Sequence, residues 1–311
     1  MRHAPGRFAL AFALLLSACS ADSNSPTGPG GPPVGTLKPW SDPATWPSGV
    51  VPAAGDSVVI PAGLSVQLDT TPPALGSLTI DGALVFGSRD LALTADWILV
   101  DGSLQAGTET SPWTHQAVIT LTGSSSGPNV AGMGNKMIGV MGRIELHGEK
   151  RAGWTHLSAT AAQGATSIAL ERNPGWRAGD RIVLASSDYN QNQAEEAVIA
   201  TVSGTAITLT APLAHHHYGQ VLTVSGVSVD ERAEVGLLTR NIRIQGDTVV
   251  GAGFGGHMMV MAGGVAKIEG VELFRMGQRS HLARYPMHWH MAGDVTGQYF
   301  RNSSVWRTFS R

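Results

Sequence analysis

The stretch that decides the fold is Leu78-Thr79-Ile80-Asp81-Gly82-Ala83-Leu84, which returns 20 residues later as Ile98-Leu99-Val100-Asp101-Gly102-Ser103-Leu104. In both copies a short apolar strand meets an Asp-Gly corner, and a second strand follows. A later pair of segments, residues 242–246 and 266–270, has the same character at a shift of 24 residues. Such units, recurring about every 20 to 25 residues, are typical of a β-solenoid, whose coils bury their inward faces only by stacking. We therefore predict a right-handed parallel β-helix; a β-sandwich would match the strand density but not as easily the register of the glycine corners.

The composition of the 311-residue chain agrees with an all-β fold. It contains 39 Gly and 17 Pro, and only 14% of its residues are charged. Few charged helix formers and many turn-forming and β-branched residues disfavour helical bundles, so we expect little helix. Lys plus Arg number 21 and Asp plus Glu 23, so the net charge is 21 − 23 = −2, which argues against nucleic acid as a partner. The sequence also lacks a P-loop, a dinucleotide-binding glycine motif, a Gly-x-Ser-x-Gly elbow and a CxxC pair.

The middle of the chain breaks the solenoid pattern. Between residues 154 and 222, strands are expected at 167–170, 181–185, 197–202 and 206–209, separated by Asn-Pro-Gly, Gly-Asp and Ser-Gly turns. This pattern predicts a small antiparallel β-barrel inserted into the β-helix, with Trp154 and Trp176 packed inside it. The β-helix would then have two parts, residues 38–153 and 223–311. No cap follows the last coil, so we expect either a truncated chain or a partner at that end.

The N-terminus is typical of a lipoprotein leader. Basic residues precede an apolar run at 8–16, and the run ends at Leu16-Ser17-Ala18-Cys19. We predict a signal peptide at 1–18, an acylated Cys19 and a flexible Gly/Pro/Ser-rich tether at 19–37. The alternative is an ordinary secretion signal with a coincidental cysteine. The expected location is outside the cell, anchored to its surface by lipid alone, and Ser20 favours the outer membrane in a Gram-negative host.

Several motifs resemble a known family. Trp40-Ser-Asp-Pro-Ala-Thr-Trp46, Pro52-Ala-Ala-Gly-Asp56 and Val58-Val-Ile-Pro-Ala-Gly63 resemble the start of a G8 domain, which residues 38–153 would form. Residues 232–241 and 284–294 look like the segments that follow it in the cell-surface hyaluronan-binding and hyaluronidase family; fibrocystin-like proteins also carry G8 domains. The resemblance implies an extracellular β-helix protein that binds, and as an enzyme would cleave, hyaluronan or a similar acidic polysaccharide.

Asp56 and Asp69 are the first candidate catalytic residues, and the resemblance matches both. A glycosidase needs one protonated and one ionised carboxyl group about 5 to 9 Å apart. Asp56 opens a strand and Asp69 ends the next one, so stacked coils could bring the two together. The alternative is that each aspartate accepts backbone N–H bonds in a turn.

The second candidate site is His288-Trp289-His290. Because side chains alternate along a strand, both imidazoles should share one face and Trp289 the other. With Asp294 they could act catalytically, hold a metal ion or bind a carboxylate-bearing sugar. We expect substrate-binding roles for Trp289 and for three nearby bases, His257, Arg279 and Arg284. The alternative is a histidine ladder satisfied inside the β-helix, or ordinary surface histidines.

Two further features carry weaker predictions. Calcium could bind at Asp-rich turns of the solenoid. The Asp81-Gly82 corner, however, has a single carboxylate and is also explained as an ordinary turn. The sequence therefore leaves the cofactor unknown. The run His215-His216-His217 favours a solvated loop over a metal site, because adjacent residues do not share a face.

The predicted function is binding and acid/base depolymerisation of an extracellular, hyaluronan-like polysaccharide, by hydrolysis or by elimination. Two alternatives stay open: a non-catalytic glycan-binding or adhesion module, and a purely structural solenoid.

Overall fold

The computed structural model describes residues 35–249 and 251–310. The predicted leader, Cys19 and most of the tether therefore lie outside the described residues. No helix within these two ranges is long and apolar enough to cross a membrane.

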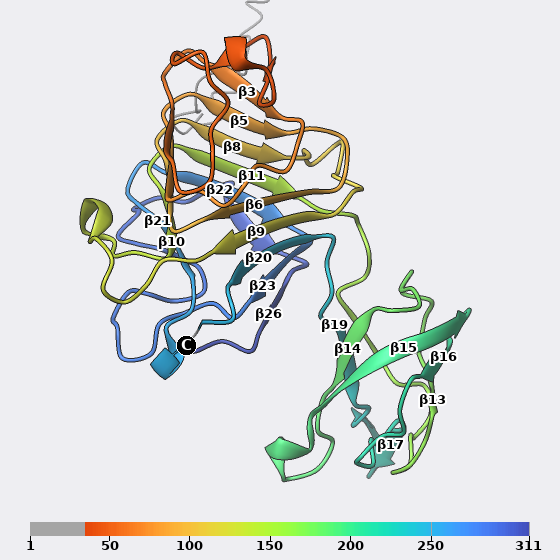
Figure 1. Ribbon diagram of the computed structural model, residues 1–311. Coiled ribbons are helices and arrows are strands. Elements are labelled where there is room, and N and C mark those ends of the chain that lie inside the picture. The colour runs from red at the N-terminus through yellow and green to blue at the C-terminus, as the bar shows by residue number, and fades with distance from the viewer. Residues whose placement is uncertain (1–34, 250, 311) are drawn as a thin grey trace, which may run out of the picture.

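Three parallel sheets wind around one axis and form a β-helix (Figure 1). Sheet A contains β1 (Lys38–Pro39), β3 (Ser65–Leu68), β5 (Ala83–Phe86), β8 (Ser103–Ala106), β11 (Arg143–His147), β22 (Val265–Glu269) and β25 (Tyr299–Arg301). Sheet B contains β2 (Ser57–Ile60), β4 (Ser77–Ile80), β7 (Ile98–Val100), β10 (Met137–Val140), β21 (His257–Val260) and β24 (His288–Trp289). Sheet C contains β6 (Leu91–Ala95), β9 (Ala117–Leu121), β20 (Ile242–Gly246), β23 (Val271–Phe274) and β26 (Ser304–Trp306).

The 20-residue repeat is confirmed by the strand register. Leu78 lies beside Ile98 in sheet B, and in sheet A the partner of Leu84 is Leu104. The glycine at the corner is required by close packing, since a Cβ atom on Gly102 would lie 1.9 Å from the carbonyl oxygen of the glycine one coil above. Stacked coils thus meet at their corners backbone to backbone.

The second predicted repeat, 242–246 with 266–270, is wrong. Strand β20 lies in sheet C and pairs with β23, so Ile242 stacks on Val271. Strand β22 lies in sheet A and pairs with β11. Both segments alternate apolar and polar residues because each has one inward face, but alternation does not say which side of the coil a strand occupies.

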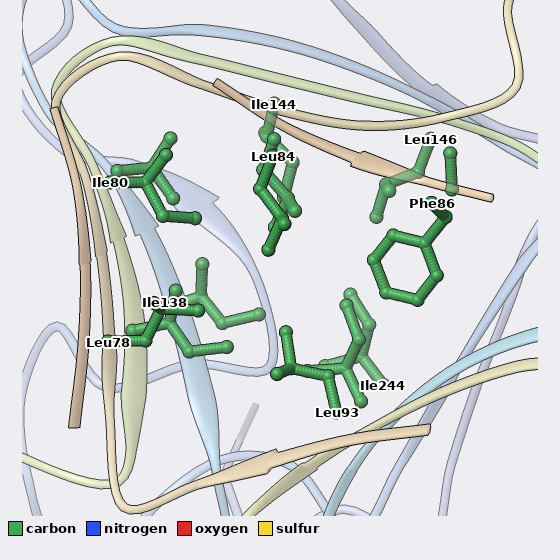
Figure 2. Close-up of a cluster of buried hydrophobic side chains, with 14 of the residues drawn as sticks. Leu78, Ile80, Leu84, Phe86, Leu93, Ile138, Ile144, Leu146 and Ile244 are labelled. Atoms are coloured by element: carbon green, nitrogen blue, oxygen red, sulfur yellow. The ribbon is translucent and has the colours of Figure 1, made fainter. Parts of the chain in front are cut away.

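Inward-facing aliphatic side chains from all three sheets fill the β-helix (Figure 2). Leu78 and Ile80 from sheet B, Leu84 from sheet A and Leu93 from sheet C are fully buried. Burying one such side chain contributes about 1.5–3 kcal/mol. These stacked aliphatic rows therefore hold the coils together, and the outward residues are left free for other roles.

An antiparallel unit leaves the β-helix after β11 and returns at β20, as the all-β prediction with an inserted barrel expects. Its sheet order is β12 (Trp154–His156), β19 (Glu234–Leu237), β14 (Arg181–Leu184), β15 (Glu195–Ser203), β16 (Ala206–Leu209) and β13 (Ser167–Ala169). The unit thus includes a strand beyond residue 222. A separate hairpin joins β17 (Val221–Val224) and β18 (Val227–Asp230).

The core of this insert contains one of the two predicted tryptophans. Trp176 is buried among Leu157, Ile182 and other apolar residues. Trp154 is 49% exposed, so its predicted packing is wrong. Alternation along β12 turns the buried Thr155 inward and Trp154 outward.

Helical structure is confined to short 3-10 turns in the described part of the chain. These are η1 (Pro43–Thr45), η2 (Val130–Gly132), η3 (Gln191–Gln193) and η4 (Gly251–Gly253).

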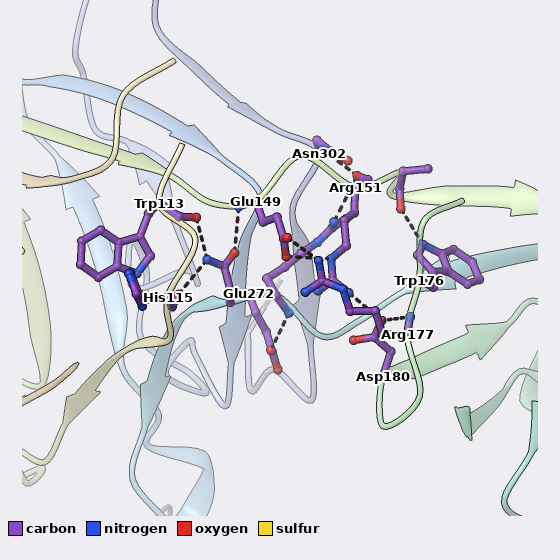
Figure 3. Close-up of polar contacts among 12 residues, drawn as sticks. Trp113, His115, Glu149, Arg151, Trp176, Arg177, Asp180, Glu272 and Asn302 are labelled. Carbon is purple, nitrogen blue, oxygen red and sulfur yellow. Dashed lines mark hydrogen bonds and ion pairs between the residues drawn. The ribbon is translucent and has the colours of Figure 1, made fainter. Parts of the chain in front are cut away.

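A polar network, buried at Arg151, Asp180 and Arg240, ties the insert to the β-helix (Figure 3). Arg151 Nη1 donates to Asp180 Oδ2 at 2.6 Å, and Arg177 Nη2 donates to Glu149 Oε1. Arg240 is only 3% exposed, and burial lowers its pKa to about 10. The network therefore connects the segment that leaves the β-helix after β11 with the segment that returns to it before β20.

The neighbouring Asn241 fastens the returning chain. Its Nδ2 donates to the carbonyl oxygens of Trp113 (2.8 Å) and His115 (2.9 Å), and its Oδ1 accepts from the Glu149 N–H. The Arg-Asn pair in the segment 232–241 therefore has a structural role at this junction.

Candidate functional site

The structure does not bring Asp56 and Asp69 together. Asp56 precedes β2 and Asp69 follows β3, so a strand, a corner and a second strand separate them along one coil. Each four-residue strand is about 13 Å long, and the two carboxyl groups lie at different corners of that coil.

Each of these two aspartates has a structural role. The exposed Asp56 carboxylate accepts from the Ala53 N–H at 2.8 Å. Asp69 accepts from the N–H and hydroxyl of Ser41 at 3.0 and 2.6 Å. Partial burial would raise the pKa of Asp69, but the bonds from Ser41 outweigh it and hold the pKa below its usual value. Asp56 behaves as a turn acceptor, and Asp69 fastens the N-terminal segment at Ser41 to the end of β3.

The segment His288-Trp289-His290 has the predicted alternation. The rings of His288 and His290 lie with centroids 5.5 Å apart. Trp289 packs against the β-helix core, and its Nε1 donates to Gln298 Oε1 at 2.8 Å. The two imidazoles therefore lie on the outer side of sheet B, while the indole belongs to the interior.

His257 lies one coil before this segment, on β21, which pairs with β24. It is fully buried, and its Nε2 donates to the Met133 carbonyl oxygen at 3.0 Å. Its Nδ1 has no hydrogen-bond partner among the described residues. Burial lowers the pKa of His257 to about 4, and the nearby Arg284, His288 and His281 lower it further. At neutral pH this imidazole is uncharged.

His288 has a similar environment. Both of its ring nitrogens are buried without a hydrogen-bond partner in the described part of the chain. Burial lowers its pKa, and the neighbouring His290 adds to the effect. The buried imidazoles of His257 and His288 therefore lie below the exposed basic side chains of Arg279 and His281 and favour the neutral form.

Arg284 is held in place by Gln278, a residue that the sequence analysis missed. Gln278 is completely buried and donates through Nε2 to the carbonyl oxygens of Asn135 (3.0 Å) and Gly255 (3.1 Å). Its Oε1 accepts from Arg284 Nη1 at 2.9 Å. No sequence signal marks this glutamine, because its partners lie in two other segments of the chain.

The remaining predicted residues lie at the surface. Arg279 is exposed, and its carbonyl oxygen is 2.8 Å from Nδ1 of the exposed His281. The exposed Asp294 accepts from the N–H and hydroxyl of Thr296, and these bonds lower its pKa. Among the described residues no group of three or more His, Cys, Asp or Glu side chains could hold a metal ion, so Asp294 does not complete a histidine metal site.

The run 215–217 differs from the expected solvated loop at its last residue. His217 is fully buried, with Nδ1 2.9 Å from the Ala185 carbonyl oxygen and Nε2 2.9 Å from Glu195 Oε1. It connects strands of the insert and has a structural role.

One segment thus gathers the chemistry of the site. Residues 279–290, which we call the basic segment, contain two arginines and three histidines and no Asp or Glu. Arginine and histidine donors suit carboxylate and sulfate groups, and arginine binds them bidentately. The arrangement can bind an anion; it lacks the pair of carboxyl groups of a glycosidase.

Two family profiles match the chain. The G8 domain matches residues 45–158, and the CEMIP beta-helix matches residues 253–311. The second match contains the whole basic segment. The chain is thus a G8 domain protein with a CEMIP-like β-helix.

Curated relatives support a distant relationship. Fibrocystin-L of Mus musculus is 35% identical over an alignment of 322 positions, which covers 88% of this chain and 8% of fibrocystin-L. The Homo sapiens protein is 36% identical over an alignment of the same length and coverage. A G8 domain-containing protein of Dictyostelium discoideum is 33% identical over 291 residues, which cover 88% of this chain and 25% of that protein. The chain therefore spans a quarter or less of the length of these relatives.

A solved tailspike, Gp54 of Acinetobacter baumannii bacteriophage AP22 in complex with a capsular saccharide, has a TM-score of 0.25 and 11% identity, covering 56% of this chain and 24% of the tailspike.

Proposed function

Because this chain is a G8 domain protein with a CEMIP-like β-helix, we propose that it binds an acidic polysaccharide at the cell surface through its basic segment. Hyaluronan-like polymers, with one carboxylate in each repeat, are the ligand class that this segment suits. The observation that carries the proposal is the concentration of two arginines and three histidines, with no carboxylate, in residues 279–290.

The buried partners of the segment support a binding role. Gln278 fixes Arg284 through a bond of 2.9 Å, so the guanidinium group does not have to be ordered when a ligand arrives. A hydrogen bond between charged groups contributes about 1.5–3 kcal/mol. A fixed arginine flanked by exposed Arg279 and His281 therefore favours a carboxylate or sulfate over a neutral sugar.

Binding rather than hydrolysis is the proposed activity. Hydrolysis by Asp56 and Asp69 would need their carboxyl groups across one glycosidic bond, and they lie at different corners of a coil. The polymer is then a ligand whose length is unchanged after release.

The cell-surface location is the part of the proposal that rests on residues 1–19. We propose that Cys19 is acylated and that the membrane is contacted through lipid alone. Acyl labelling tests this: a Cys19→Ser variant should lose the label, and equal labelling of both proteins would contradict it.

The binding proposal is tested by retention of the full chain on immobilised hyaluronan, heparin and neutral dextran. Wild type should be retained on the first two and released by salt, because exposed charge pairs are screened. Arg284→Gln should weaken retention at least tenfold, and Asp294→Asn, an exposed matched control, should not. Equal retention of Arg284→Gln and wild type would contradict the proposal. Shortening of the released polymer would show that the protein also cleaves it.

A further inference from the structure

A second cluster of arginines lies on the outer side of sheet C, away from sheet B. Strand register places Phe274 of β23 beside Trp306 of β26. Their rings lie with centroids 4.4 Å apart and planes inclined by 39°. Two consecutive coils thus present adjacent aromatic rings on one outer face.

Four guanidinium groups lie over these two rings. Arg243 and Arg275 are 5.2 and 4.6 Å from the centroid of Phe274. Arg307 and Arg181 are 5.3 and 5.8 Å from the centroid of Trp306. Each contact is within the range of a cation–π interaction, which contributes about 0.5–1 kcal/mol at an exposed site. Because Arg181 comes from β14, the β-helix and the insert both contribute to this cluster.

Two carboxylates neutralise part of this charge. Arg243 Nη2 lies 2.7 Å from Oε1 of the buried Glu272, which also accepts from Trp306 Nε1 at 2.9 Å. Glu196 of the insert binds both Arg181 (3.2 Å) and Arg307 (3.1 Å). Four guanidinium groups against two carboxylates leave a surplus of 4 − 2 = 2 positive charges.

Arg275 is the member without a carboxylate of its own. Its Nε is buried and has no hydrogen-bond partner in the described residues. Burial lowers its pKa, and Arg243 and Arg307 lower it further, while Asp247 acts in the opposite direction. Asp247 is itself held by Lys136 Nζ at 2.7 Å. The cluster therefore keeps a positive charge that no described side chain compensates.

We propose that this aromatic–arginine cluster (Arg181, Arg243, Arg275 and Arg307 around Phe274 and Trp306) is a second binding site for carboxylate or sulfate groups of an acidic polysaccharide. The rings hold the guanidinium groups, and the guanidinium N–H groups bind the anion. Successive rungs of a β-helix are about 4.8 Å apart, so an extended polymer along the axis meets groups of both coils. The class of polymer rests on the proposed function; the site itself does not use the basic segment.

A polysaccharide fits this cluster better than a nucleic acid. Polynucleotide binding depends on neutralising many phosphates, and this chain has a net charge of −2. Glu196, the partly exposed carboxylate of the cluster, can also accept hydrogen bonds from the hydroxyl groups of a sugar.

The test compares affinities of the full chain for heparin and hyaluronan oligosaccharides by calorimetric titration. Arg275→Gln should weaken binding about tenfold, and Arg307→Gln about threefold. Arg307 is 58% exposed, so its replacement should leave the fold intact. The matched control is Arg301→Gln, an arginine on sheet A that is 46% exposed and should bind like wild type. Trp306→Phe keeps a ring and should bind more tightly than Trp306→Ala.

The outcomes separate the two sites. If Arg284→Gln weakens binding while Arg275→Gln and Arg307→Gln bind like wild type, the second site is overturned and the proposed function stands. If only the cluster variants lose affinity, the second site stands and the basic segment is overturned. Absence of binding by wild type overturns both. Binding of single-stranded DNA in place of the oligosaccharides, with the same sensitivity to Arg275→Gln, also overturns the second site.

Discussion

Acid should destabilise this protein through one buried histidine, His257. Its pKa is about 4 in the folded chain against 6.5 for a free imidazole. At pH 7 the ring is neutral in both states. As the pH falls below 6.5 the unfolded chain binds a proton that the folded chain binds only near pH 4, so unfolding is favoured across this window. The groups that face the ring are the Met133 carbonyl oxygen and three bases, Arg284, His288 and His281. The carbonyl oxygen favours the imidazolium, but burial and the three bases outweigh it and keep the pKa low.

The size of the effect follows from the shift. A difference of about 2.5 pKa units at 1.36 kcal/mol per unit gives about 3 kcal/mol of stability lost between pH 7 and pH 4. Replacing His257 by Gln removes the titrating group and keeps an N–H that can donate to Met133. The free energy of unfolding, measured by urea titration at pH 7, 5.5 and 4, should therefore fall about 3 kcal/mol less in His257→Gln than in wild type.

The control is His216→Gln, because His216 is an exposed residue of the insert and its replacement should leave the pH dependence as in wild type. Parallel loss of stability in wild type and His257→Gln would refute the reasoning, since the acid sensitivity would then come from other groups.

Three other substitutions test the fold and the assignments. Gly102→Ala would place a Cβ atom 1.9 Å from a carbonyl oxygen of the neighbouring coil, so thermal unfolding should show a loss of about 1–3 kcal/mol; an unchanged transition would contradict the backbone-to-backbone corner. Asp180→Asn leaves the buried Arg151 with Glu149, 3.7 Å away, as its remaining carboxylate partner and should cost about 1–3 kcal/mol, with earlier proteolysis at the junction of the insert; unaltered proteolysis would exclude a role in fastening it. Asp56→Asn changes an exposed turn acceptor, so stability should stay within about 0.5 kcal/mol and retention on hyaluronan should not change. Loss of retention in this variant would restore Asp56 as a site residue.

Strand alternation and glycine corners made most of the fold predictable. The 20-residue repeat carried both signals, and stacked coils have the register that it predicts. The repeat between 242–246 and 266–270 carried alternation alone. It led to a wrong pairing, because the side of the coil depends on the lengths of the segments that connect the strands.

The candidate sites were predictable only where one strand defines them. Alternation placed His288 and His290 together, whereas Asp56 and Asp69 depend on the path of the chain around a corner. Gln278 binds carbonyl groups from two other segments, so no local pattern marks it. The aromatic–arginine cluster likewise combines side chains from β14, β20, β23 and β26 with residues just beyond two of these strands. These strands come together only in the folded chain.

The position of the insert also has a consequence for biogenesis. Chains emerge from the ribosome N-terminus first, so the three coils before β10 can form while synthesis continues. The coil that starts with β10 and β11 needs β20, which is made only after the entire insert. Until β20 is made, this coil lacks its strand in sheet C and leaves aliphatic residues exposed. Chaperones bind such a state, and misassembly can begin from it. Production of this protein should accordingly be most sensitive to defects in how fast the insert closes, even where those defects leave the finished molecule unchanged.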